Sequence, residues 1–237
     1  MDLNDHQMMG YDRAITLFSP DGRLLQVEYA KKTVMQGSTA LGIVYKGGVV
    51  LLADKRIVND LVIEDSVEKI FVISDHILAT GSGIISDARV LASRAQVFAQ
   101  QHQLYYGNPV DVLLVVRDLC DLMQYYTQSG AARPFGVSLL VAGYDFSPQL
   151  YETDPTGIYF KYYAKAVGEF SEEADKLLQE EYKKDMSFDE AVTLGLSILK
   201  RLLKDKFNIK RIDVGYVDNT KKYTLLSKDK IKSYLKK

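Results

Sequence analysis

The spacing of apolar and polar residues predicts strands in the first part of the chain. In residues 37–56, two short runs rich in β-branched residues flank the turn at residues 46–48, a pattern typical of a β-hairpin. A second pair of such runs, in residues 69–83, is broken at residues 74–76. These segments predict two hairpins near the start of a folded domain.

Helical spacing replaces this pattern further along the chain. Apolar residues recur at steps of three and four in residues 87–106, and Pro109 then opens a second helix, since proline suits a first helical turn. Ser171 and Ser187 are the predicted N-caps of two later helices, and Glu190 completes a capping box with Ser187. The chain therefore contains two predicted pairs of helices.

Strand-like runs follow each helix pair. They occupy residues 137–145, 149–155 and 158–168 after the first pair, and residues 211–218 and 222–227 after the second. Blocks of strands that alternate with helix pairs indicate antiparallel sheets with helices on their outer faces. We therefore expect an α+β layered domain rather than a doubly wound one. No long linker interrupts the chain, so residues 1–237 are expected to form a single domain.

A further helix is predicted before the first strand, over residues 20–35. It follows a turn built from Pro20, Asp21 and Gly22. Leu25 and Tyr29 form a small apolar patch on this helix, with no evident partner within the chain. The larger patch is a stripe about 140° wide that can cover the body of the domain, and it contains Leu24, Val27, Ala30, Val34 and Met35.

Composition narrows the classes of function. The chain is 47% hydrophobic and 26% charged, as in ordinary soluble domains, and its net charge of −1 gives no reason to expect a nucleic acid or an anionic membrane as partner. No apolar run approaches the roughly 20 residues that span a bilayer. Cys120 is the single cysteine, which excludes an intramolecular disulfide and suits a reducing compartment such as the cytoplasm.

Residue types that hold metals or cofactors are sparse. None of the three histidines has a partner at ligand spacing, so neither a zinc site nor a cysteine–histidine nucleophile is expected. The glycines of residues 81–83 lack the spacing of a dinucleotide fingerprint or a P-loop. We therefore expect no cofactor and no metal.

One set of residues has the outline of a nucleophile site. Ser38 begins a predicted strand, Asp54 ends the next one, and Lys69 begins a later one. An N-terminal nucleophile uses its own α-amino group as the base, because the pKa of that group is near neutrality. The nitrogen of Ser38 is an amide unless the chain is cleaved before it. A self-processing hydrolase with Ser38 as nucleophile is therefore the alternative interpretation.

Residues 11–42 resemble the signature of α-type subunits of the proteasome core particle. The resemblance continues through residues 51–56, 67–70, 86–91, 126–128, 133–145, 154–157 and 190–195, and it is closest to archaeal α-subunits. It implies a four-layer αββα sandwich of the N-terminal-nucleophile hydrolase type with an extra N-terminal helix. It also implies a non-catalytic role in a heptameric outer ring, while β-subunits hold the threonine nucleophiles.

The resemblance further implies a gate over the pore of the ring. Residues 1–13 would be a flexible gate arm in which residues 1–10 form a mobile plug. The extra helix would cross the top of the sandwich at the ring surface. The residues implied in the gate are Tyr11, Asp12, Arg13, Pro20 and Tyr29.

Two other sites are implied by the same resemblance. Lys69 and Gly37 correspond to a pocket between neighbouring α-subunits that receives the C-terminal carboxylate of a regulatory AAA ATPase. Ser129 and Gly130 lie in the loop implied to line the inner constriction of the pore, where many archaeal relatives carry tyrosine at position 129. The expected partners are thus other α-subunits, β-subunits, the ATPase and unfolded proteins in transit.

Overall fold

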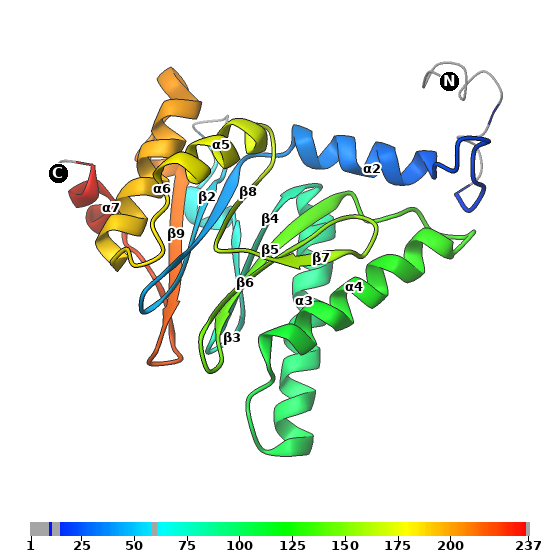
Figure 1. Cartoon of the computed structure of the whole chain (residues 1–237), viewed down its shortest axis with the longest axis horizontal. Coiled ribbons are helices and arrows are strands. Elements are labelled where there is room, and N and C mark those ends of the chain that lie inside the picture. Colours follow the sequence, from blue (N-terminus) through cyan, green and yellow to red (C-terminus); the bar gives the residue numbers. More distant parts are fainter. Residues whose placement is uncertain (1–9, 11–14, 58–60, 236–237) are drawn as a thin grey trace.

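Two antiparallel sheets lie face to face between outer layers of helices (Figure 1). The computed structural model describes residue 10, residues 15–57 and residues 61–235. Three apolar clusters separate the layers: one under each helical layer and one between the sheets. The predicted four-layer α+β sandwich is confirmed.

The first sheet has the strand order β10-β9-β2-β1-β8, and all its neighbouring strands are antiparallel. Both strands of the first predicted hairpin lie at its centre, because their side chains are apolar on both faces and are almost all buried. Its strands are β1 (Ala40–Tyr45), β2 (Gly48–Asp54), β8 (Ala164–Val167), β9 (Ile212–Asp218) and β10 (Tyr223–Leu225).

The second sheet is a meander whose five strands follow one another in space as in sequence. They are β3 (Ile70–Ser74), β4 (Ile77–Gly83), β5 (Val137–Tyr144), β6 (Pro148–Thr153) and β7 (Tyr159–Lys161). The prediction of one strand over residues 158–168 is wrong, since β7 and β8 belong to different sheets. The chain crosses between the sheets at Tyr162 and Tyr163, where Tyr162 donates its N–H to Leu150 of β6 and Tyr163 accepts from Val44 of β1.

Helices α3 (Ile85–Tyr106) and α4 (Val112–Gln128) pack on the second sheet. On the first sheet lie α5 (Ser171–Glu181), α6 (Phe188–Leu203) and α7 (Lys228–Tyr234). Short 3₁₀ turns occur at Glu64–Ser66, Lys204–Lys206 and Ile209–Arg211. The capping box of Ser187 and Glu190 is confirmed. Ser171, in contrast, is the first helical residue of α5 and not its cap, and Phe170 precedes it.

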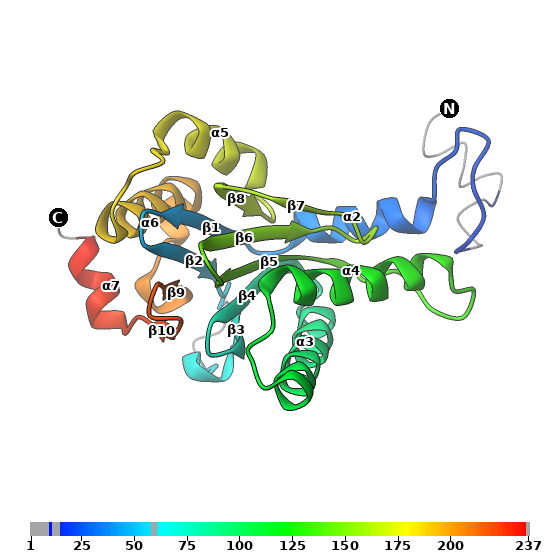
Figure 2. The same ribbon diagram turned by 60° about the horizontal axis from the view of Figure 1, so that its bottom comes forward.

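The extra helix α2 (Leu25–Gln36) extends from the end of the sandwich beside β4 and β5 (Figure 2). It begins at Leu25 rather than at residue 20, because the residues before it form a separate turn. Val27, Ala30 and Val34 are buried as expected, but Met35 of the predicted stripe is 51% exposed. Leu25 is buried, so the prediction that it has no partner within the chain is wrong.

Candidate functional site

The chain enters α2 through a tight turn at Ser19–Gly22. Ser19 and Gly22 close the turn by a backbone hydrogen bond of 2.8 Å, and the Ser19 hydroxyl accepts the N–H of Arg23 at 3.2 Å. Gly22 has a φ of +73°, a conformation that L residues rarely adopt. Pro20 lies exposed at the second position of the turn, where its fixed φ is favourable. The turn thus sets the direction from which residues before Ser19 approach the helix.

The C-terminal end of α2 is fixed to β4. The hydroxyl of Ser82 donates to the carbonyl of Val34 at 3.1 Å. A methyl group at Gly37 would lie 2.1 Å from the backbone nitrogen of Gly83, so this position accepts glycine alone. The carbonyl of Gly37 also accepts the N–H of Glu169 at 2.9 Å. The helix, β4 and the connection from β8 to α5 therefore meet at Gly37.

Gly136 joins α2 to the loop that follows α4. Its carbonyl accepts the hydroxyl of Thr33 at 3.1 Å and the N–H of Ile84 at 2.9 Å. Its own N–H donates to the Asp87 carboxylate, which also takes two hydrogen bonds of 2.7 and 2.8 Å from Arg133. These donors hold the pKa of Asp87 below its usual value despite partial burial.

These contacts were not predicted, although Asp87, Arg133 and Gly136 all lie in segments that resemble the family. They anchor one end of the loop that carries Ser129 and Gly130. Ser129 is half-buried directly after α4, and Gly130 is exposed with open space around its α-carbon. The end of α4 with this loop and the N-terminal part of α2 lie on the same side of the molecule in both views (Figures 1 and 2).

The predicted nucleophile residues are all buried. Ser38 and Asp54 have little exposed surface. Ser38 comes immediately after Gly37, the residue that caps the C-terminal end of α2. The Asp54 carboxylate accepts two hydrogen bonds from the Arg211 guanidinium, at 2.9 and 2.7 Å. Asp54 is thus engaged in a buried bidentate ion pair. Its carboxylate therefore serves a structural contact in this chain.

Lys69 is unusual because its ammonium group is buried. The residue is 2% exposed, and among the described residues no hydrogen-bond partner reaches its Nζ. Burial lowers the pKa of Lys69 to about 8; Asp54 nearby opposes this shift and Arg56 adds to it. Leaving a buried charge unpaired is costly, and native structures rarely do so without a reason.

A cavity of about 400 Å³ adjoins Lys69. Its walls include Glu68, Leu225 and the ion pair of Lys55 with Asp213, whose atoms are 3.0 Å apart. Lys55 therefore has a carboxylate partner in this cavity, whereas Lys69 has none among the described residues. The Nζ of Lys69 has almost no exposed surface, so an anion could reach it only if the surrounding segment opened.

The remaining predicted gate residues are only partly within the described chain. Tyr11, Asp12 and Arg13 lie outside the described residues, as do residues 1–9. Tyr29 lies half-buried on α2, and the ammonium of Lys32 is 5.7 Å from the centre of its ring. The grouping of Tyr29 and Pro20 with the three undescribed residues stays a prediction.

Metal sites and membrane-spanning helices are both lacking among the described residues. Within residues 15–57 and 61–235, no group of three or more histidine, cysteine or carboxylate side chains is arranged to hold a metal ion. No described helix combines the length and the apolar character that crossing a membrane requires. Cys120 is buried in α4, and burial raises the pKa of its thiol to about 12.

Comparison with known proteins gives two family matches. Residues 34–217 match the family of proteasome subunits, and residues 11–32 match the N-terminal signature of its A-type members. The proteasome alpha subunit of Archaeoglobus fulgidus is 46% identical over 230 residues, covering 97% of this chain and 94% of the relative. The same name belongs to relatives in Pyrococcus horikoshii (48% identity, covering 95% of this chain and 87% of the relative) and Methanosarcina barkeri (46%, covering 96% and 92%).

Proposed function

Because the chain belongs to the proteasome subunit family and carries the signature of its A-type members, we propose that it is a non-catalytic subunit of the outer ring of a proteasome core particle. The observation that carries this proposal is α2, which places a folded helix directly before Ser38. Four buried apolar side chains of α2 belong to the domain, and Gly37 is packed against β4. Cleavage before Ser38 would remove this helix, so the upstream residues have a structural role.

The alternative is a hydrolase that processes itself before Ser38. The engagement of Asp54 by Arg211 speaks against it, because that carboxylate is not free to orient a nucleophile. The purified chain is therefore expected to keep all residues before Ser38 and to hydrolyse no peptide. Intact-protein mass spectrometry together with a fluorogenic peptide assay measures both. A chain beginning at Ser38, with activity lost in Ser38→Ala, would establish the alternative.

Assembly with other subunits of the particle is supported by the outer face of α3. Val90, Val97 and Leu104 recur at seven-residue intervals, which places them on one side of the helix. They are 54%, 48% and 82% exposed, and Tyr105 and Tyr106 extend this apolar surface at the end of the helix. We name Val90, Val97 and Leu104 the α3 stripe. Exposed apolar surfaces of this kind mark protein contacts.

Gating is supported by the position of the N-terminal turn. The turn at Ser19–Gly22 and the loop at Ser129–Gly130 lie on one side of the subunit (Figure 1). In a ring whose pore is on that side, residues 1–13 would reach over the opening and the loop would line a constriction below it. Unfolded protein would pass this opening to reach β-type subunits with threonine nucleophiles. The compartment that fits this role is the cytoplasm.

Docking of a regulatory AAA ATPase is supported by Lys69. A terminal carboxylate would supply a partner for its buried ammonium, which has no hydrogen-bond partner among the described residues. The charged form of Lys69 predominates below about pH 8. Because the side chain is almost fully buried, docking requires the surrounding segment to open. Gly37 packs on Gly83 at the end of β4, and Thr80 in the middle of the same strand donates its hydroxyl to the Lys69 carbonyl.

Lys69→Met is expected to abolish stimulation of the assembled particle by the ATPase or by its C-terminal peptide. The lost charge-assisted contact is worth about 1.5–3 kcal/mol, or roughly ten- to a hundredfold in affinity. Basal hydrolysis of small peptides should not change. The same substitution should raise the free energy of unfolding by roughly 1–3 kcal/mol, because it removes a buried unpaired charge while retaining shape.

Peptide titration and thermal melts of Lys69→Met separate the two effects. Lys210→Met serves as control, because Lys210 is a surface residue paired with Glu64. Undiminished stimulation of the Lys69 variant would remove this residue from the docking site. A variant that is both unstimulated and less stable would point to a structural role instead.

A further inference from the structure

A second cavity, of about 550 Å³, lies where the chain crosses from one sheet to the other. Its walls come from the turn between β1 and β2, the start of β6, the crossover at Tyr162 and Tyr163, and the connection from α5 to α6. It includes no residue of α2 or of the loop after α4. Its volume lies in the range of small-molecule sites, about 300–1,000 Å³.

Tyrosine rings form much of the wall. Tyr163 and Tyr182 are nearly parallel, with an angle of 26° between their planes and 6.3 Å between their centres. Tyr162 is half-buried beside them, and Tyr45 is buried below with its edge toward Phe188. Tyr163 is 59% exposed, so part of its ring remains available to a ligand. Such rings stack on planar groups.

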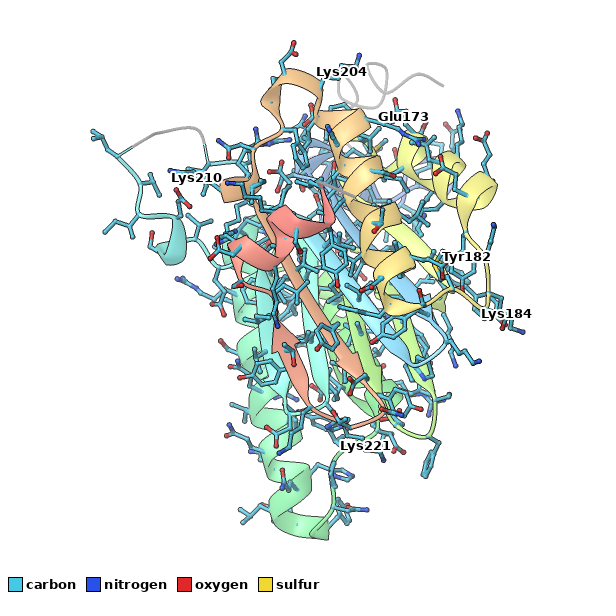
Figure 3. All side chains as sticks on the ribbon, turned by 90° about the vertical axis from the view of Figure 1, so that its left-hand side faces the viewer. Glu173, Tyr182, Lys184, Lys204, Lys210 and Lys221 are labelled. Atoms are coloured by element: carbon cyan, nitrogen blue, oxygen red, sulfur yellow. The ribbon has the colours of Figure 1, made fainter. Side chains whose placement is uncertain are left out.

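Lysines surround this aromatic wall. Lys46, Lys161 and Lys184 are exposed, and within the described chain no carboxylate lies within salt-bridge distance of any of them. The Lys184 ammonium is 5.5 Å from the centre of the Tyr163 ring. Figure 3 shows Tyr182 and Lys184 together on the connection from α5 to α6. Asp185 is the one acidic residue of the lining, so the cavity carries a positive charge.

The backbone around the cavity is already hydrogen-bonded. The N–H of Lys46 donates to Met186 at 3.0 Å, and the N–H groups of Val44 and Tyr162 are taken by the crossover contacts described above. The Tyr182 hydroxyl donates to the carbonyl of Val44 at 3.1 Å. A peptide could therefore not add as a strand here. The cavity is preformed and presents side chains, which favours a small ligand.

We propose that this cavity binds a nucleoside di- or triphosphate, with the base on the exposed Tyr163 ring and the phosphates among Lys46, Lys161 and Lys184. Aromatic faces accept any base, and lysine binds phosphate as a point charge. A nucleotide has both a planar ring and anionic groups, so it would use both the tyrosine rings and the lysines of this cavity. The proposal is independent of the gate and of the Lys69 cavity.

Isothermal titration calorimetry on the full-length chain tests the proposed nucleotide binding, with ATP in the presence of EDTA as the probe. Adenosine tests the base alone and inorganic tripolyphosphate tests the anion alone. ATP should bind saturably, and at least about tenfold more tightly than adenosine or tripolyphosphate. Adenosine lacks the phosphate contacts and tripolyphosphate lacks the stacking of the base, and each loss should weaken binding by about that factor. Hexaglutamate tests the competing class, an acidic peptide.

Lys161→Met and Lys184→Met should each weaken ATP binding about tenfold, and Tyr163→Leu should do so to a similar degree. The matched controls are Lys176→Met on α5 and Tyr125→Leu on α4, since Tyr125 is 62% exposed and neither residue lines the cavity. Controls should bind ATP as the unmodified chain does.

Three results would overturn the proposal. The first is the absence of saturable ATP binding at millimolar concentration. The second is tripolyphosphate, adenosine or hexaglutamate binding as tightly as ATP. The third is ATP affinity that does not differ between the cavity variants and their controls. Thermal melts of every variant verify that each remains folded, and Lys184→Met, at an exposed position, is the variant least able to disturb the fold.

Discussion

A particle assembled from β-type subunits and a chain that lacks residues 1–10 should degrade an unfolded protein without any ATPase. The reason is steric: an unfolded chain can pass a narrow pore, and the proposed arms stand in its way. We expect turnover of a casein-like substrate to rise roughly tenfold or more over that of the full-length particle. In the full-length particle gate opening limits the rate, and the truncation removes that limit. The two particles should differ less in their hydrolysis of small peptides than in their turnover of the casein-like substrate.

Tyr11→Ala provides the contrasting variant. It keeps residues 1–10 but removes the hydroxyl group of Tyr11. The resemblance implies that this residue holds the gate open together with Asp12, Pro20 and Tyr29. ATPase tails should bind this particle yet open the gate poorly, so activated turnover should fall while basal turnover stays low. Casein turnover with and without activator distinguishes the two variants. If the truncated particle stays at the basal rate of the full-length one, the N-terminal arm is not the gate.

Charge placed on the α3 stripe should prevent assembly. In Val97→Glu/Leu104→Glu, two carboxylates would have to be buried in a contact between subunits, at a cost of several kcal/mol each without partners. The chain itself should stay folded, because both side chains are exposed and such substitutions change stability by about 0.5 kcal/mol or less. The particle should therefore be lost while the free subunit remains.

Size-exclusion chromatography after co-expression with a β-type subunit measures this loss, and a thermal melt verifies the fold. Gln103→Glu is the control, since it adds a charge to the same helix away from the α3 stripe and should assemble normally. Full-size particles formed by the double variant would show that the stripe is not buried by assembly.

Local patterning explains how far the fold could be predicted. The hairpins and helices could be predicted from the spacing of apolar residues along the chain. Buried strands and helices with one apolar side differ in this spacing. Residues 158–168 show the limit. The strand breaks at Tyr162 and at a bend at Tyr163, which hydrogen-bond to different sheets. The run of strand-forming residues continues across this break, so nothing in the local sequence pattern marks the change of sheet.

The candidate site shows a similar limit. The motifs pointed to Lys69 and Gly37, and the packing at Gly37 leaves room for no side chain. They could not reveal that the Lys69 ammonium is buried with no hydrogen-bond partner in the described part of the chain, because that depends on contacts between distant segments. The contacts of Asp87 with Arg133 and Gly136 were missed for the same reason, since they join residues almost fifty positions apart.

Native mass spectrometry of the chain co-expressed with a β-type subunit tests the central claim most directly. A non-catalytic outer-ring subunit should appear in a complex of stacked rings, with its N-terminal residues retained and with peptidase activity that depends on the β-type threonine alone. A chain recovered outside any such complex, cleaved before Ser38 and active by itself, would contradict the account.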